Sequence, residues 1–111
     1  MALGYLALLL VRLAGASWAD AETVNVEGRG AVDLKPFVCQ DITRSSLVNR
    51  VCYDAANRTM IVQLNSVYSQ VCDVPEATRD EFLNAPSMGQ YYKASIGDSG
   101  TGPYQCEPQE F

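Results

Sequence analysis

Four cysteines, Cys39, Cys52, Cys72 and Cys106, all follow an apolar N-terminal leader, and these two features constrain the chain more than any other. An exported protein can oxidise an even number of thiols in pairs, whereas the same thiols in a reducing cytosol would favour a metal or redox site. The sequence has no histidine and no Cys-x-x-Cys pair, so it disfavours both a zinc site and a redox-active dithiol. We therefore expect a small secreted or periplasmic domain with two disulfides and no metal or other cofactor.

The leader is an apolar run over residues 2–13 followed by small residues, which is typical of a secretory signal peptide. The run is shorter than the roughly 20 residues that a membrane-spanning helix needs. Small residues at positions 19 and 21 predict cleavage after Ala21, with Ala19 as a second site, so that residues 1–21 are removed and no stable membrane span remains. Arg12 interrupts the run, which leaves open an uncleaved anchor or a cytosolic chain with a misplaced start.

The charge of the chain bears on its partners. The net charge is −5, and the acids gather toward both ends of the segment that follows the leader. An acidic surface repels phosphate backbones, so nucleic acid is a poor default partner. A chain of this size has a modest core, and each disulfide would contribute about 2–4 kcal/mol of stability.

The segment after the leader divides into three parts. Residues 22–44 are predicted as an N-terminal extended segment with a short edge strand at 23–26, which ends at two glycines. Residues 45–96 form the main domain, in which β-branched and aromatic runs at 47–53, 59–64 and 67–72 are separated by turn-forming residues. Residues 97–111 are a C-terminal tail tied down by Cys106.

Helical signals follow the strand runs. Pro75 suits a first helical position, and apolar residues at 74, 82, 83 and 85 form a stripe that ends at Pro86. Ser87 is a suitable N-cap for a second short helix. The predicted fold class is α+β, a three-stranded antiparallel β-meander covered by one or two short helices, with disulfides.

Four cysteines allow three disulfide pairings. Cys52 and Cys72 fall on the first and third strands of the meander, separated by a strand at about 4.8 Å spacing on each side, too far for a normal bridge. This argument disfavours only the pairing that contains a Cys52–Cys72 bridge. Sequence cannot choose between the pairings, and our preference is Cys39–Cys52 with Cys72–Cys106.

Several short motifs carry a family resemblance. They are Ser45-Ser46, residues 51–54 (VCYD), Met60-x-Val62-x-Leu64, Val74-Pro75, and residues 82–92 (FLNAPSMGQYY). Together they resemble the KTSC domain, a module found at the C-terminus of some lysyl-tRNA synthetases, here as an exported, cysteine-containing variant. The resemblance implies a β-meander with a helix and an unassigned function, for which RNA binding has been suggested. The family's Tyr-x-Tyr in the third strand falls here on Ser69 and Val71, so aromatic side chains that could stack on bases are missing there.

The residues offer no catalytic set, because a chain without histidine lacks the commonest general base, and we expect a protein that is not an enzyme. A candidate binding surface is predicted from Tyr68, Tyr91, Tyr92, Arg50 and Lys93, although the simpler interpretation is that most of the tyrosines fill the thin core. The leading hypothesis is a non-enzymatic exported module that binds a protein, a peptide or an envelope component. The alternative is nucleic-acid binding, as the family resemblance suggests.

Overall fold

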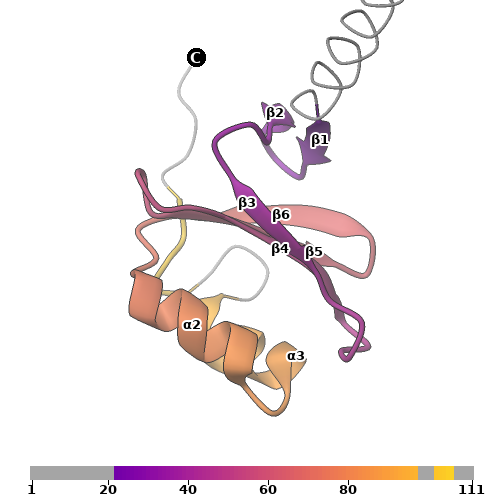
Figure 1. Cartoon of the computed structure of the whole chain (residues 1–111), viewed down its shortest axis with the longest axis vertical. Helices are drawn as coiled ribbons and strands as arrows, with labels where there is room; N and C mark the ends of the chain where they lie inside the picture. The colour runs from indigo at the N-terminus through magenta and orange to yellow at the C-terminus, as the bar shows by residue number, and fades with distance from the viewer. Residues whose placement is uncertain (1–21, 98–101, 107–111) are drawn as a thin grey trace, which may run out of the picture.

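The computed structural model describes residues 22–97 and 102–106, so the predicted signal peptide lies outside the described residues. The described part forms one sheet with helices against it (Figure 1). Its elements in chain order are β1 (Thr23–Val26), β2 (Gly30–Asp33), β3 (Val38–Asp41), β4 (Val48–Asp54), β5 (Thr59–Leu64), β6 (Val67–Val71), α2 (Glu76–Asn84), α3 (Met88–Tyr91) and the π-helical turn η1 (Tyr92–Ile96). The predicted α+β class is confirmed. Over the same residues, no helix is long and apolar enough to cross a membrane.

The sheet has six strands in the order β2-β1-β6-β5-β4-β3, so the predicted number of three is wrong. The predicted meander forms its centre, where β4 pairs antiparallel with β5 and β5 with β6. At the turn between β4 and β5, the Asp54 carboxylate accepts hydrogen bonds from the backbone N–H of Ala56 (3.1 Å) and the side-chain amide of Asn57 (2.9 Å). Asp and Asn thus shape this turn through their side chains, as the sequence predicts.

The three additional strands come from residues 22–44, which were predicted as an extended segment with one edge strand. β1 and β2 form a hairpin whose turn holds Gly28 and Gly30 at φ of 80° and 86°, values that a residue with a Cβ rarely adopts. β1 is not an edge strand, because Val26 pairs in parallel with Tyr68 of β6. β3 pairs antiparallel with β4 and forms the other end of the sheet.

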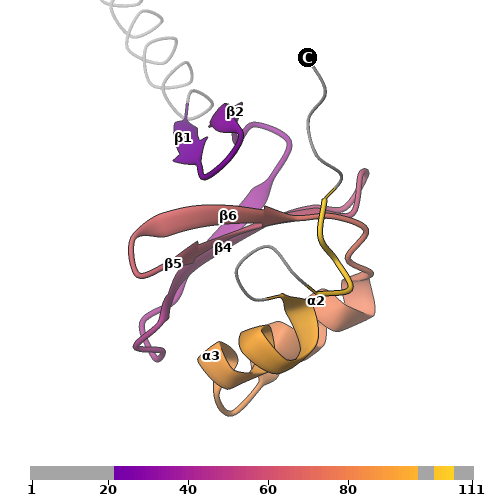
Figure 2. The ribbon, with the colours of Figure 1, turned by 180° about the vertical axis from the view of Figure 1, so that it is seen from behind.

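Both faces of the sheet are covered. Alternation along β5 puts Met60 and Val62 on the helix face and Ile61 on the opposite face, and all three are fully buried. The helix face packs against α2, α3 and η1, whereas the opposite face packs under the β1–β2 hairpin and the segment after it (Figures 1 and 2). The sequence predicts a meander with one covered face, whereas the structure has a second core on the other face, made of Val24, Val26, Leu34, Cys52 and Ile61.

The helices begin and end close to the predicted positions. Pro75 is the N-cap of α2 rather than its first helical residue, and the helix ends at Asn84, before Pro86. The Ser87 hydroxyl accepts a hydrogen bond from the Gln90 N–H (3.3 Å) and caps α3, as predicted. Phe82 and Met88 bring both helices into the core of the helix face.

The two disulfides are the preferred pairs, Cys39–Cys52 and Cys72–Cys106. Cys39 and Cys52 lie directly opposite each other in the β3–β4 pair, with Cα atoms 3.9 Å apart. Cys72 and Cys106 join the end of β6 to the tail, where the Cys72 N–H donates to the Tyr104 carbonyl (2.8 Å). Two disulfides in so small a chain indicate folding in an oxidising, non-cytoplasmic compartment.

Candidate binding surface

The five residues predicted to form a binding surface lie on opposite sides of the sheet. Arg50 and Tyr68 are on the face under the hairpin, whereas Tyr91, Tyr92 and Lys93 belong to α3 and η1 below the other face. The structure does not bring them together into one patch.

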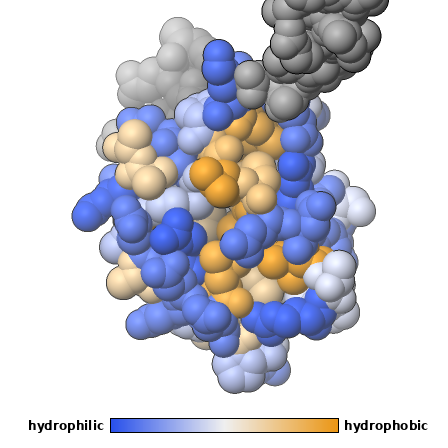
Figure 3. Space-filling view, viewed as in Figure 1, coloured by the Kyte–Doolittle hydropathy of each residue, from blue (hydrophilic) through white to orange (hydrophobic). Residues whose placement is uncertain are grey.

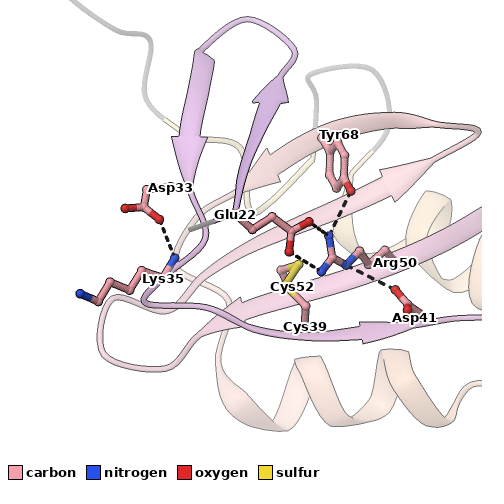
Figure 4. Close-up of a disulfide and its surroundings, with 8 residues drawn as sticks. All are labelled: Glu22, Asp33, Lys35, Cys39, Asp41, Arg50, Cys52 and Tyr68. Carbon is pink, nitrogen blue, oxygen red and sulfur yellow. Dashed lines mark hydrogen bonds and ion pairs between the residues drawn. A yellow bond between two sulfur atoms is a disulfide. The ribbon is translucent and has the colours of Figure 1, made fainter. Parts of the chain in front are cut away.

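Arg50 is held in an ion-pair network beside the hairpin (Figure 4). Its guanidinium donates two hydrogen bonds to the Glu22 carboxylate (2.6 and 2.9 Å) and a third to the Tyr68 hydroxyl oxygen (3.3 Å). The buried Nε makes no hydrogen bond among the described residues but lies 3.4 Å from the Asp41 carboxylate. This cation is therefore engaged within the fold, where it joins the residue before β1 to β3, β4 and β6.

The same network shifts two ionisations. Hydrogen bonding to Arg50 lowers the pKa of Glu22, and that bond in turn raises the pKa of Arg50. The Glu22 side chain is 51% exposed, so solvent screens much of this attraction. Both shifts favour the charged forms that make the ion pair.

The residues of α3 and η1 divide between core and surface. Tyr92 is only 5% exposed and packs against Phe82, with ring centroids 5.9 Å apart. The Tyr91 ring also stacks on Phe82, with ring centroids 6.0 Å apart, and the Tyr91 hydroxyl donates a hydrogen bond to the Glu81 carboxylate (2.9 Å). Burial, and then the bond to Glu81, raise the pKa of Tyr91. Lys93 is exposed, so Tyr92 fills the core and only Lys93 is fully open to a partner.

A groove of about 280 Å³ lies between β3 and α2, and the sequence analysis did not predict it. Val38 of β3 stands at its rim and is 75% exposed, more than any other large hydrophobic side chain among the described residues. In Figure 3, hydrophobic residues gather in the middle of this face, framed by hydrophilic ones. The other residues that line the groove are Gln40, Val51, Tyr53, Arg79, Asp80 and Leu83.

Three of the four polar side chains that line the groove, those of Tyr53, Arg79 and Asp80, are held by contacts within the fold. The Arg79 guanidinium lies 4.6 Å from the centre of the Tyr53 ring, and its Nε donates to Asp80 (2.8 Å). The Tyr53 hydroxyl donates to the Val74 carbonyl (2.6 Å), and burial raises the pKa of Tyr53. Arg44 donates to the Leu83 carbonyl (2.8 Å) near the end of α2. The groove is therefore a preformed feature.

The outer edge of β3 adds backbone groups to this surface. The Ile42 N–H donates to the Asn49 carbonyl (2.9 Å), so these two residues form a hydrogen-bonded pair. In an antiparallel pair of strands such pairs alternate along the chain, so Gln40 and Val38 also direct their N–H and C=O groups toward β4. Cys39 and Asp41 then occupy the non-hydrogen-bonded positions, in agreement with the close Cα approach of Cys39 and Cys52. The N–H and C=O groups of Cys39 and Asp41 consequently point outward, away from β4.

The described residues contain no group of three or more His, Cys, Asp or Glu side chains that could hold a metal ion. The four cysteines are all in disulfides. The ion pairs around Arg50 and Arg79 are those of a folded surface, with each carboxylate facing a guanidinium.

Residues 44–99 match the KTSC domain, which is half of the chain. The chain belongs to the KTSC domain family. The family assignment agrees with the resemblance drawn from residues 45–96. The crystal structure of a KTSC domain protein from Yersinia pestis is similar, with 26% identity and a TM-score of 0.52 over 57% of this chain and 89% of that one. The comparison with curated proteins gives no match.

The KTSC match begins after β3, so it excludes β1, β2 and β3. One wall of the groove, α2, therefore lies within the KTSC domain, and the other, β3, comes from the segment before it. The sequence signal that could have revealed β3 was Cys39: a residue that forms a disulfide with a central strand residue needs a neighbouring strand or loop to carry it.

Proposed function

We propose that this chain is an exported, non-enzymatic KTSC domain that binds a protein partner, either free in the periplasm or extracellular space or part of the cell envelope. Export is supported by the leader and by the two disulfides. Cleavage after Ala21 would leave Glu22 as the first residue, and its carboxylate is the one held by Arg50. Mass spectrometry of the secreted product tests this step: we expect a chain starting at Glu22 with no free thiol.

The observation that carries the binding function is the groove beside an open strand edge. It combines the exposed Val38 and the apolar side chains of Val51 and Leu83 with polar side chains around them, and a hollow of this mixed composition can accommodate a partner's side chain.

A protein partner fits this surface better than RNA. Binding to phosphates requires clustered, available Lys and Arg. Arg50 is paired with Glu22 and Asp41, and Arg79 with Glu76 and Asp80. The RNA binding suggested for the lysyl-tRNA synthetase type of KTSC domain is therefore not the function that we propose here.

Site-specific crosslinking in the host tests the proposed function. A photoreactive amino acid is introduced at Val38, at Lys93 and, as a control, at Val67, which is 45% exposed at the start of β6. We expect a discrete protein adduct from position 38 and none from position 67. An adduct only from position 93 would keep the binding function and move the site, whereas no protein adduct from any position would contradict it.

A further inference from the structure

We propose that the partner contributes an extended segment of alternating basic and apolar residues, which pairs with the outer edge of β3 as a further strand and inserts an apolar side chain into the groove. The inference rests on the proposed function and specifies its partner.

The backbone of β3 supports strand addition. Cys39 and Asp41 direct their N–H and C=O groups away from β4, and β3 is the last strand at this end of the sheet. Unpaired edge groups are a template for another strand, and such pairing supplies affinity through main-chain hydrogen bonds. The Cys39–Cys52 disulfide fixes β3 against β4, so little ordering of this edge is needed on binding.

The side chains of β3 define the alternation. Val38 faces the groove, whereas Cys39 and Asp41 face the opposite side of the sheet, near Arg50. An added strand would therefore place every second side chain over the groove, against Val38 and Leu83, and the intervening ones beside Asp41. The groove positions favour apolar residues, because Val38, Val51 and Leu83 offer apolar contact there, between the polar side chains of Gln40, Tyr53, Arg79 and Asp80.

The charge of the protein around the groove indicates which residues the partner carries between its apolar ones. The two elements that bound the groove, β3 and α2, carry four acids, Asp41, Glu76, Asp80 and Glu81, against one base, Arg79, a net charge of −3. Asp41 is 85% exposed at the edge and contacts Arg50, and Asp80 is 60% exposed at the rim and contacts Arg79. Acids therefore exceed bases at this site, although these two carboxylates already have an arginine neighbour. Lysine or arginine in the intervening positions would complement these carboxylates, and a like-charged segment would be repelled.

Three peptides of equal length test the proposal against the disulfide-bonded protein purified after secretion. They are KVKVKVK, EVEVEVE and KSKSKSK, each with blocked ends, and binding is measured by calorimetry and by amide chemical shifts. We expect KVKVKVK to bind at least about tenfold more tightly than either control, a difference of about 1.4 kcal/mol, with shifts at Cys39, Asp41 and Leu83. Equal binding of EVEVEVE or KSKSKSK would overturn the proposal.

Variants of β3 separate the contributions of apolar contact, charge and main-chain hydrogen bonding to peptide binding. Val38→Asp should weaken KVKVKVK binding by about tenfold or more, because it puts a carboxylate where an apolar contact is expected. Asp41→Ala should weaken it by removing a charge. Asp41→Pro should weaken it further, because proline also removes the outward N–H and an edge strand tolerates it. Val67→Asp is the matched control and should change nothing.

Each outcome decides the proposal. If Asp41→Pro and Asp41→Ala bind KVKVKVK equally, strand pairing is excluded. If the wild-type protein forms a dimer that Val38→Asp dissociates, the edge belongs to a second copy of this chain and the proposal fails. An amide spectrum of each variant shows whether it is folded. A protein adduct at position 38 without peptide binding would overturn this inference and leave the proposed function standing.

Discussion

At the residue scale, the fold depends on a few polar side chains whose partners lie far away in the sequence. Arg50 binds Glu22 across 28 positions, and the Tyr53 hydroxyl reaches the Val74 carbonyl across 21. One of these contacts is half-exposed and ionic, and the other is buried and neutral. They should respond differently to pH and to substitution.

Glu22→Gln should lower the free energy of unfolding at neutral pH, and the difference from wild type should vanish in acid. The bond to Arg50 lowers the pKa of Glu22 in the folded state, so its stabilisation is present above the unfolded value and is lost as the pH falls through the folded one. Urea unfolding between about pH 7 and pH 3 measures this. Wild-type and variant curves that stay parallel over the whole range would contradict it.

Tyr53→Phe should destabilise the protein by about 1–3 kcal/mol, because the buried Val74 carbonyl loses its hydrogen bond and gains no water. Tyr104→Phe is the control: its hydroxyl lies 3.4 Å from that of Thr78 in a half-buried position, and we expect a smaller loss. Urea unfolding at neutral pH compares the two. An equal loss of unfolding free energy in the two variants would show that the hydrogen bond to the Val74 carbonyl stabilises the protein no more than the half-buried contact of Tyr104 does.

At the scale of elements, the disulfides fix segments whose own strand pairing is short. β3 has four residues and is joined to β4 by Cys39–Cys52. Among its described residues 102–106, the tail has one bridge to β6, between Val71 and Gln105, and is joined there by Cys72–Cys106. Each disulfide therefore holds a chain segment that pairing alone would hold weakly.

Replacing Cys72 and Cys106 by alanine should cost about 4 kcal/mol, and replacing Cys39 and Cys52 about 3 kcal/mol. The first pair closes the longer loop, with a sequence separation of 34 against 13, and so restricts the unfolded chain more. Urea unfolding without reductant measures both costs. Hydrogen exchange adds a local test, since the amide of residue 72 should lose protection only in the first variant.

At the scale of the whole molecule, the KTSC domain carries an additional layer on the face away from its helices. The hairpin of β1 and β2 covers that face. Among the described residues, its strand pairing with the rest of the sheet is limited to Val26 of β1 opposite Tyr68 of β6. Packing of apolar side chains and the ion pair between Glu22 and Arg50 therefore contribute more than strand pairing to holding the layer in place.

Val26→Asp should detach the hairpin without unfolding the meander, because Val26 is 1% exposed and its packing holds the layer. We expect faster hydrogen exchange at the amides of β1 and β2, unchanged protection at Val62, and increased binding of a hydrophobic dye to the uncovered face. Val67→Asp, at an exposed position, is the control. Simultaneous loss of protection in the hairpin and in β5 would show that the two layers unfold as one unit.

The sequence by itself determined the central meander, the helix positions and the KTSC family, because these follow from local alternation, turn residues and a dense motif within residues 45–96. It also disfavoured a Cys52–Cys72 bridge, since strand order limits which cysteines can meet, and the structure decided between the pairings that remained. Only the tertiary structure decided the six-stranded sheet, the pairing of Arg50 with Glu22 and the groove beside β3. Those features join residues distant in the chain, and strands of four residues contain too few alternating positions to reveal, before folding, which neighbours they will have.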